Sequence, residues 1–372
     1  MFPSPSIAAQ RSVTSSSRIA GLDGLRGLAA LMVLTSHLAN AGHLPRVLGQ
    51  GFGLTGVCLF FGLSGFLMGR LYLGTQPDGA ALTRFAAQRL GRVLPLYLAV
   101  VMLSTAATAA GVASGIAYRI APGPDLAAHV LALRGTGVLW SIPVELHFYV
   151  SFVLLWIGTA RLPAVPLWSI AALLYGLSLV LWASGTLTDP YIFPLWASVF
   201  LAGTALGAAH TRGSALRLPP RALGLAALVA LILLPPEVRR AIGLPVTRPF
   251  LDPLTLGLCA LLFLGGLTAS GPARLLATPL FGWLGQVSFG VYLLHMPVLG
   301  AVEAANLGAA TAPTVILLTL ALAQLSLKWL ERPAQLWITR RAPTAPASGQ
   351  RSSASGSETG PQTAMSRTAP SP

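Results

Sequence analysis

Long apolar stretches separated by short polar segments make up most of the chain. About ten of them approach the roughly 20 residues that a helix needs to cross a bilayer. They cover residues 21–40, 51–73, 93–112, 138–158, 163–184, 191–209, 222–235, 252–269, 280–300 and 312–330. The stretch at 222–235 is short and ends at Pro235-Pro236, so we expect it to be tilted or partly interfacial. The pattern predicts an all-α, polytopic integral membrane protein with about ten transmembrane helices.

The composition agrees with this pattern. Of the 372 residues, 54% are hydrophobic and only 9% are charged, against about 25% charged in an ordinary soluble domain. These values exclude a soluble globular enzyme and a disordered protein. The two cysteines, Cys58 and Cys259, lie inside apolar stretches. We therefore expect neither a disulfide scaffold nor a thiolate metal site, and no bound metal.

The net charge of +14 is explained by membrane topology rather than by nucleic acid, since the basic residues are not clustered on a polar face. With the amino terminus inside, 18 of the 24 basic residues fall on the cytoplasmic side and six outside. Cytoplasmic loops carry such an excess of Arg and Lys. The bias predicts that both termini are cytoplasmic. Arginine dominates and Lys328 is the one lysine, which indicates a GC-rich bacterial genome and hence a bacterial inner membrane.

Three segments are expected along the chain. Residues 1–18 are rich in Ser and Pro and residues 339–372 are nearly free of apolar side chains, so both are predicted to be disordered and cytoplasmic. Residues 19–338 form the membrane domain. A cleaved signal peptide ending near Ala39-Asn40-Ala41 is the alternative for the first span. Asp23 and His37 would be unusual within such a peptide.

Ionisable residues inside spans are expensive and are therefore functional candidates. Arg26 and His37 are eleven residues apart in the first span, roughly 16 Å along a helix, so they are not direct partners. His37, Glu145 and His295 all fall in the outer half of their spans, with Asp23 and Ser141 as further candidates. We expect the first three to line a single polar cavity. The alternative is that each bonds a neighbouring backbone or hydroxyl group.

Arginines lead into the third span. Arg89 and Arg92, at i, i+3 spacing, share a helix face, and Arg84 precedes them. Paired guanidinium groups suit phosphate. Arginines that only anchor the span at the cytoplasmic side of the membrane would show the same spacing. Gly65 and Gly69 form a small-xxx-small pattern that predicts close helix packing. Their segment is not a G-x-S-x-G nucleophile elbow, because Gly65 follows Ser64 directly.

Taken together, these residues resemble the acyltransferase-3 family of integral-membrane O-acyltransferases over about residues 20–335. The similarity is carried by Leu22-Asp23-Gly24-Leu25-Arg26-Gly27 with His37, Phe60-Phe61-Gly62-Leu63-Ser64-Gly65-Phe66, Arg89 with Arg92 before Pro95-Leu96-Tyr97, Trp140-Ser141 with Glu145 and Phe148-Tyr149, Tyr292-Leu293-Leu294-His295-Met296-Pro297, and Glu331-Arg332-Pro333 at the end of the last span.

The resemblance implies transfer of an acyl group, commonly acetyl, from cytoplasmic acyl-coenzyme A to a hydroxyl of a saccharide or glycolipid such as O-antigen or exopolysaccharide. The donor is then a substrate and no cofactor stays bound. The resemblance also implies that His37 is essential, that Arg26 is its motif partner and that Arg89 and Arg92 bind the donor. Some relatives carry an extracytoplasmic hydrolase-like domain that is absent here, so a separate extracytoplasmic protein is a possible partner.

The residues suggest a mechanism. The donor's phosphates would be held by Arg26, Arg84, Arg89 and Arg92. A neutral His37 would act as general base. Glu145 would orient the imidazole ring, as the carboxylate of a triad does. The reverse assignment, with Glu145 as the base and His37 as the orienting group, fits the sequence equally well. An acyl-histidine intermediate is a further option. Leu146 and His147 replace the Glu and Gln that more usually follow the acid, which leaves the orientation of Glu145 open.

A transporter or flippase of a glycolipid or small solute is the alternative class, because such proteins also carry intramembrane His and Glu. Transporters often show paired interrupted spans in two halves. This sequence has no such symmetry, and the acyltransferase is favoured.

Overall fold

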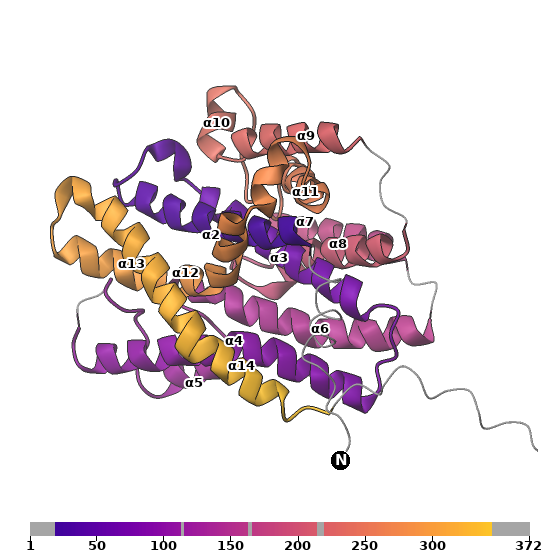
Figure 1. Ribbon diagram of the computed structural model, residues 1–372, viewed down its shortest axis with the longest axis horizontal. Coiled ribbons are helices and arrows are strands. Elements are labelled where there is room, and N and C mark those ends of the chain that lie inside the picture. The colour runs from indigo at the N-terminus through magenta and orange to yellow at the C-terminus, as the bar shows by residue number, and fades with distance from the viewer. Residues whose placement is uncertain (1–18, 113–114, 163–165, 214–218, 344–372) are drawn as a thin grey trace, which may run out of the picture.

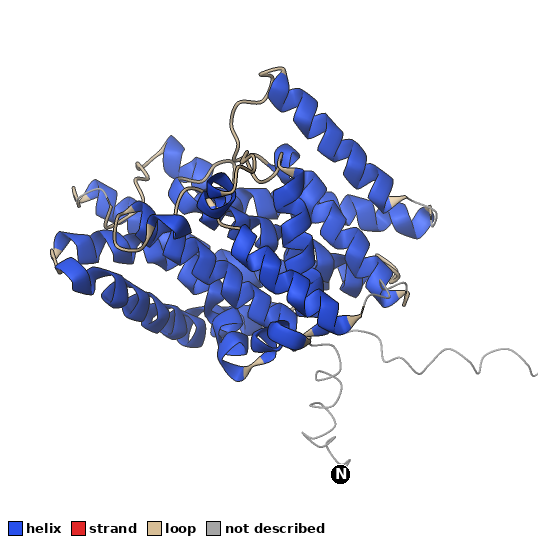
Figure 2. Ribbon diagram, turned by 90° about the horizontal axis from the view of Figure 1, so that it is seen from above, coloured by secondary structure: helices blue, strands red, loops and turns tan. Residues whose placement is uncertain are grey.

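The computed structural model describes residues 19–112, 115–162, 166–213 and 219–343. The segments predicted to be disordered, 1–18 and most of 339–372, lie outside these residues. Throughout the described part the regular elements are helices, without a β-strand (Figure 2). The all-α prediction is therefore confirmed.

The helices follow one another in this order: α2 (Ala20–Asn40), α3 (Phe52–Tyr72), α4 (Gly79–Ala109), α5 (Pro124–Val130), α6 (Ser141–Arg161), α7 (Leu167–Ala183), α8 (Phe193–Thr211), α9 (Pro220–Leu233), α10 (Pro236–Ala241), α11 (Pro253–Thr268), α12 (Pro279–Ala304), α13 (Thr311–Ser326) and α14 (Arg332–Thr339). Short 3₁₀ segments lie between them: η1 (Arg46–Leu48), η2 (Gly137–Trp140), η3 (Gly271–Ala277) and η4 (Gly308–Ala310). A π-helical segment, Leu327–Glu331, joins α13 to α14.

Each of the ten predicted stretches overlaps one of these helices. Within the described residues, six helical segments are long and apolar enough to cross a membrane, or seven if the pair α11 and η3, bent by 73°, counts as one span. The apolar helices α7 and α9 are shorter than that test requires. The chain is therefore a polytopic membrane protein, while the count of ten spans stays a prediction.

Two predicted boundaries are wrong. The third span was expected to start at residue 93, but α4 begins at Gly79, because Asp78 Oδ1 accepts a hydrogen bond from Ala81 N at 2.7 Å and caps the helix. Three arginines thus lie inside the helix rather than before it. At the other end, the helical run continues past Glu331-Arg332-Pro333 to Thr339, since the π-helical segment lets α13 pass into α14.

Helices α3 and α8 lie side by side near the centre of the molecule (Figure 1). A Cβ atom added at Gly65 would lie 2.0 Å from Phe200 O, and one at Gly69 would lie 2.0 Å from Thr204 O. A Cβ added at Gly203 of α8 would likewise lie 2.2 Å from Gly62 O. The prediction that Gly65 and Gly69 allow close helix packing is confirmed.

We expect Gly65→Ala to destabilise the protein by about 1–3 kcal/mol or more, because its Cβ would meet a backbone carbonyl that has no room to move. Gly62→Ala on the same helix is the matched control, since a Cβ there has nothing within 4 Å. The measurement is the thermal unfolding midpoint of the detergent-purified variants. Equal midpoints for the two substitutions would contradict the packing argument.

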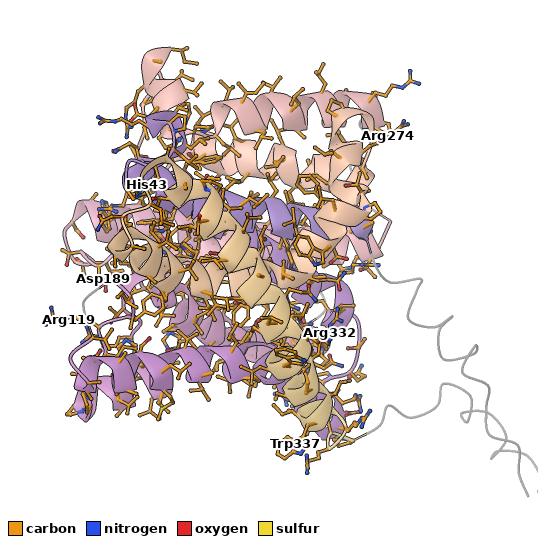
Figure 3. All side chains as sticks on the ribbon, turned by 60° about the vertical axis from the view of Figure 1, so that its left-hand side comes forward. His43, Arg119, Asp189, Arg274, Arg332 and Trp337 are labelled. Atoms are coloured by element: carbon orange, nitrogen blue, oxygen red, sulfur yellow. The ribbon has the colours of Figure 1, made fainter. Side chains whose placement is uncertain are left out.

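Labelled polar side chains from segments predicted to lie outside and inside are found toward different sides of the molecule, while the orientation of the chain in the membrane stays a prediction. Figure 3 places His43, Arg119 and Asp189 on one side of the molecule and Arg274 and Arg332 toward the other. The first three belong to segments predicted to lie outside, and the last two to segments predicted to lie inside. We call these the His43 end and the Arg332 end of the bundle.

Candidate active site

Helix α2 is fixed by glycines of its Leu22–Gly27 motif. A Cβ at Gly24 would lie 1.8 Å from Leu276 O of η3, and one at Gly27 would lie 2.6 Å from Leu284 Cβ of α12. From the other side, a Cβ at Gly285 of α12 would lie 2.0 Å from Asp23 O. Side chains are thus excluded from one face of α2. Arg26, between these contacts in the sequence, lines a cavity instead.

This first cavity, here named the arginine cavity, has a volume of about 70 Å³ and is lined by Arg26, Arg89, Arg92 and Glu145. Helices α2, α3, α4, α6 and α12 all contribute to it, with Ser64, Ser141, Tyr149, Ser288 and Tyr292 as its other polar side chains. Asp23 lies behind Arg26, with 3.9 Å between Oδ1 and Nη1. Arg84, predicted to act with the other arginines, does not line the cavity.

Glu145 is held by two hydroxyl donors. Ser64 Oγ donates to Glu145 Oε1 at 2.9 Å, and Tyr149 OH donates to the same oxygen at 2.6 Å. Neither donor was predicted. Tyr149 was detectable in principle, because it lies at i+4 from Glu145 on the same helix face. Ser64 was interpreted only as part of a packing segment, and nothing in one sequence pairs it with residue 145.

Positive charge exceeds negative charge in the arginine cavity. Among its lining residues three guanidinium groups face one carboxylate, and no ion pair within 4.0 Å joins them. Arg89 is positioned by Tyr72, whose hydroxyl accepts a bond from Nη2 at 3.4 Å, while Arg89 Nε is buried without a hydrogen-bond partner in the described residues. Unpaired guanidinium donors of this kind suit anionic groups.

A second, larger cavity lies on the side of His37. This histidine cavity has a volume of about 550 Å³ and is lined by His37, Asn40, Tyr118, Trp140, Tyr191 and Arg248, among others. Val57 and Tyr292 line both cavities. The two cavities therefore adjoin each other across these two side chains.

His37 has a second histidine as its neighbour. The rings of His37 and His295 are 5.1 Å apart between centroids, with their planes at 45°. His295 is fully buried, and its Nδ1 lies 3.1 Å from Val291 O. A carbonyl oxygen only accepts, so Nδ1 carries the proton and Nε2 of the neutral ring is an unprotonated acceptor. Nε2 has no hydrogen-bond partner among the described residues.

The expected meeting of His37, Glu145 and His295 around one cavity is wrong. Glu145 lines the arginine cavity, whereas His37 lines the histidine cavity, and the His37 side chain makes no hydrogen bond in the described part of the chain. The hydrogen bonds of Glu145 give the reason: both of its donors, Ser64 of α3 and Tyr149 of α6, line the arginine cavity and hold the carboxylate there.

The family model for the acyltransferase domain of the acyltransferase-3 family matches residues 19–327, most of the described chain. The chain belongs to this family. Its relatives include the exopolysaccharide production protein ExoZ of Rhizobium meliloti (strain 1021), which is 29% identical over 292 residues, covering 71% of this chain and 83% of ExoZ. No solved structure matches the chain. The resemblance read from the sequence motifs is confirmed, and the protein is a membrane acyltransferase.

Proposed function

We propose that this acyltransferase moves an acetyl group from acetyl-coenzyme A to a hydroxyl of an exopolysaccharide or its membrane-bound precursor, in a bacterial inner membrane. The observation that carries the proposal is the pair of adjoining cavities, one with excess guanidinium groups and one with His37. A transferase needs one site for an anionic donor and another for a hydroxyl acceptor. The name of the relative ExoZ supports the choice of acceptor.

The arginine cavity is the proposed donor site, with the Arg332 end of the bundle and both termini facing the cytoplasm. Arg89, close to Tyr72 at the end of α3, would meet the donor's phosphates. Arg26 and Arg92 would bind charge further in. A cavity of about 70 Å³ has room for only a few water molecules. The narrow thioester arm would enter it, and the nucleotide would stay outside.

The proposed chemistry takes place where the cavities adjoin. A neutral His37 accepts the proton of the acceptor hydroxyl as its oxygen bonds to the thioester carbonyl carbon. The carbon–sulfur bond then breaks, and the thiolate that leaves takes the proton back from His37. Arg26 and its neighbours supply positive charge near the oxyanion that forms between these steps. With Glu145 bonded to Ser64 and Tyr149, its proposed role is to hold the arginine cavity rather than to orient His37.

His295 is a proposed positioning residue in this mechanism, through its unprotonated Nε2 beside His37. We expect His295→Ala to lower kcat about 10-fold, less than the 10²- to 10⁴-fold that a proton-transfer group contributes, because His295 acts through His37, and without raising the donor KM. It should also move the acid limb of the pH–rate profile, which loss of packing alone would leave in place. His295→Gln, which restores an acceptor, should recover part of kcat. Unchanged kcat and an unchanged profile in His295→Ala would rule the role out.

The experiment that tests the proposed function uses the purified full chain in lipid nanodiscs. Labelled acetyl-coenzyme A and exopolysaccharide oligosaccharides are supplied, with and without an extract of extracytoplasmic proteins that would contain a separate partner. Mass spectrometry should find the acetyl group ester-linked to a sugar, in the absence of any membrane gradient. Failure to transfer from any acyl-coenzyme A, with or without the extract, would contradict the proposal.

A further inference from the structure

The histidine cavity has an aromatic wall that the transfer chemistry does not require. Trp140 and Tyr191 lie with their ring centroids 4.7 Å apart. Trp140 is only 8% exposed and is packed against Trp196 and Phe61, with centroid distances of 5.5 and 5.9 Å. Tyr191 is 44% exposed, and its backbone N donates to Asp189 Oδ1. Rings fixed in this way present rigid, amphipathic surface, which suits the apolar C–H face of a sugar.

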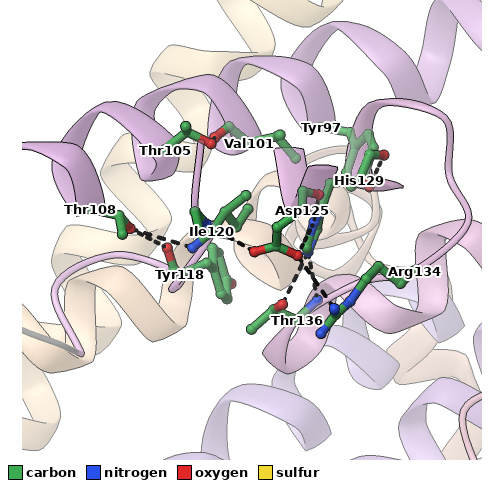
Figure 4. A network of polar contacts seen from close by, with 11 residues as sticks. Tyr97, Val101, Thr105, Thr108, Tyr118, Ile120, Asp125, His129, Arg134 and Thr136 are labelled. Atoms are coloured by element: carbon green, nitrogen blue, oxygen red, sulfur yellow. Dashed lines mark hydrogen bonds and ion pairs between the residues drawn. The ribbon is translucent and has the colours of Figure 1, made fainter. Parts of the chain in front are cut away.

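Another part of the wall comes from the segment 115–137, which includes α5 and is held by its own polar network, drawn in Figure 4. His129 Nδ1 donates to Asp125 O at 2.8 Å, and Thr136 N donates to His129 Nε2 at 3.2 Å. Tyr118, which lines the cavity, donates its hydroxyl to Leu293 O at 2.8 Å. Burial, together with the neighbouring Tyr292, raises the pKa of Tyr118 well above its ordinary value, so this donor stays protonated. The cavity is therefore pre-organised.

Arg248, in the segment between α10 and α11, brings an unpaired charge to the cavity. Its guanidinium carbon lies 5.5 Å from the centroid of the Trp182 ring, and no carboxylate lies within 4.0 Å of it among the described residues. The other arginines predicted to lie on this side mostly have such a partner: Arg134 has Asp125, Arg239 has Asp252 and Arg240 has Glu237.

Among the described residues that line the cavity, Arg248 is the one charged side chain, and neither Asp nor Glu belongs to the lining. Asp189, two residues from Tyr191, is not part of the lining. A guanidinium group that packs against an aromatic ring and has no carboxylate partner can bind a carboxylate or a phosphate through two parallel hydrogen bonds.

We propose that the histidine cavity binds an anionic acceptor, with its anionic oxygens on Arg248, a sugar ring on Trp140 and Tyr191, and the reacting hydroxyl toward His37. This inference rests on the proposed function and specifies its acceptor. The anionic group is either the carboxylate of an acidic sugar or the diphosphate of a lipid-linked precursor. The cavity volume of about 550 Å³ lies within the range of small-molecule sites.

The test compares three acceptors: a neutral oligosaccharide, the same oligosaccharide with one glucuronic acid, and the neutral one linked to a short polyprenyl diphosphate. We expect at least one anionic acceptor to be preferred, and Arg248→Gln to raise its KM about 10- to 100-fold, as loss of a charged hydrogen bond does. The KM of the neutral acceptor and of the donor should not change. Arg240→Gln, which removes an equal charge outside the cavity, is the control and should leave all KM values unchanged.

Binding to the His37→Ala protein, followed by tryptophan fluorescence, separates this inference from the proposed function. Arg248-dependent binding of an anionic acceptor by a protein whose wild type transfers no acetyl group would support the site and contradict the function. Preference for the glucuronate or for the diphosphate acceptor identifies the anionic group. Equal binding of all three acceptors, or equal weakening of all three by Arg248→Gln, would overturn the inference.

Discussion

His37→Ala should reduce acyl transfer by about 10²- to 10⁴-fold, the range expected when a general base is removed, while the protein reaches the membrane in normal amount. His37 lines the histidine cavity, its side chain makes no hydrogen bond within the described residues, and its ring contacts that of His295. Its loss therefore removes the proton acceptor without breaking a bond that the fold needs. The measurement is the initial rate with labelled acetyl-coenzyme A and a saturating acceptor.

His147→Ala is the matched control for this substitution. His147 is exposed, lies two residues after Glu145 on α6 and lines neither cavity. We expect its rate to stay within about twofold of the wild type, as exposed positions away from such features usually permit. A His37→Ala rate as high as that of His147→Ala would exclude His37 as the base.

Arg89→Gln and Arg92→Gln should weaken binding of the acyl donor and leave binding of the acceptor unchanged. Each removes one guanidinium from the arginine cavity, and neither Arg89 nor Arg92 has a carboxylate within ion-pair distance among the described residues. A charged hydrogen bond contributes about 1.5–3 kcal/mol, which corresponds to a rise of about 10- to 100-fold in the donor KM. Steady-state kinetics with acetyl-coenzyme A as the varied substrate measures this change.

Two further arginines serve as comparisons for that series. Arg340 is exposed at the end of α14, and Arg340→Gln should behave as the wild type. Arg84 lies on α4 but does not line the arginine cavity, so Arg84→Gln should affect the donor KM less than either Arg89→Gln or Arg92→Gln. A larger effect at residue 84, or a change confined to the acceptor KM, would contradict the assignment of the donor site.

The positions of the helices were predictable because the physics that sets them is local. A lipid-facing helix must be apolar over its length, and the apolar stretches mark it directly. The close packing at Gly65 and Gly69 was equally predictable, because two residues without side chains at i, i+4 spacing in a span usually mark the place where another helix approaches. The early start of α4 was also encoded, in the capping residue Asp78, but the apolar pattern alone hid it.

The meeting of ionisable residues was not predictable in the same way. Counting residues from the end of a span gives an approximate depth, but it does not give the side of the helix or the partners that a side chain meets. Ser64 and Tyr149 hold Glu145 at the arginine cavity. Glu145 therefore joins the arginines, and His37 has His295 as its neighbour instead. Arg248 lies in a loop, and no motif in the sequence marks it as a site residue. Only the fold brings it to the cavity of His37.

The most direct test of the central claim locates the acyl group of a bound donor. A non-hydrolysable thioether analogue of acyl-coenzyme A with a photoreactive acyl chain would be irradiated on the wild-type enzyme, and the labelled residues would be identified by mass spectrometry. The two-cavity account predicts label on His37, Val57 or Tyr292, where the cavities adjoin. Label confined to the apolar cavity between α3, α7, α8 and α11, at residues such as Trp168 or Phe263, would contradict it.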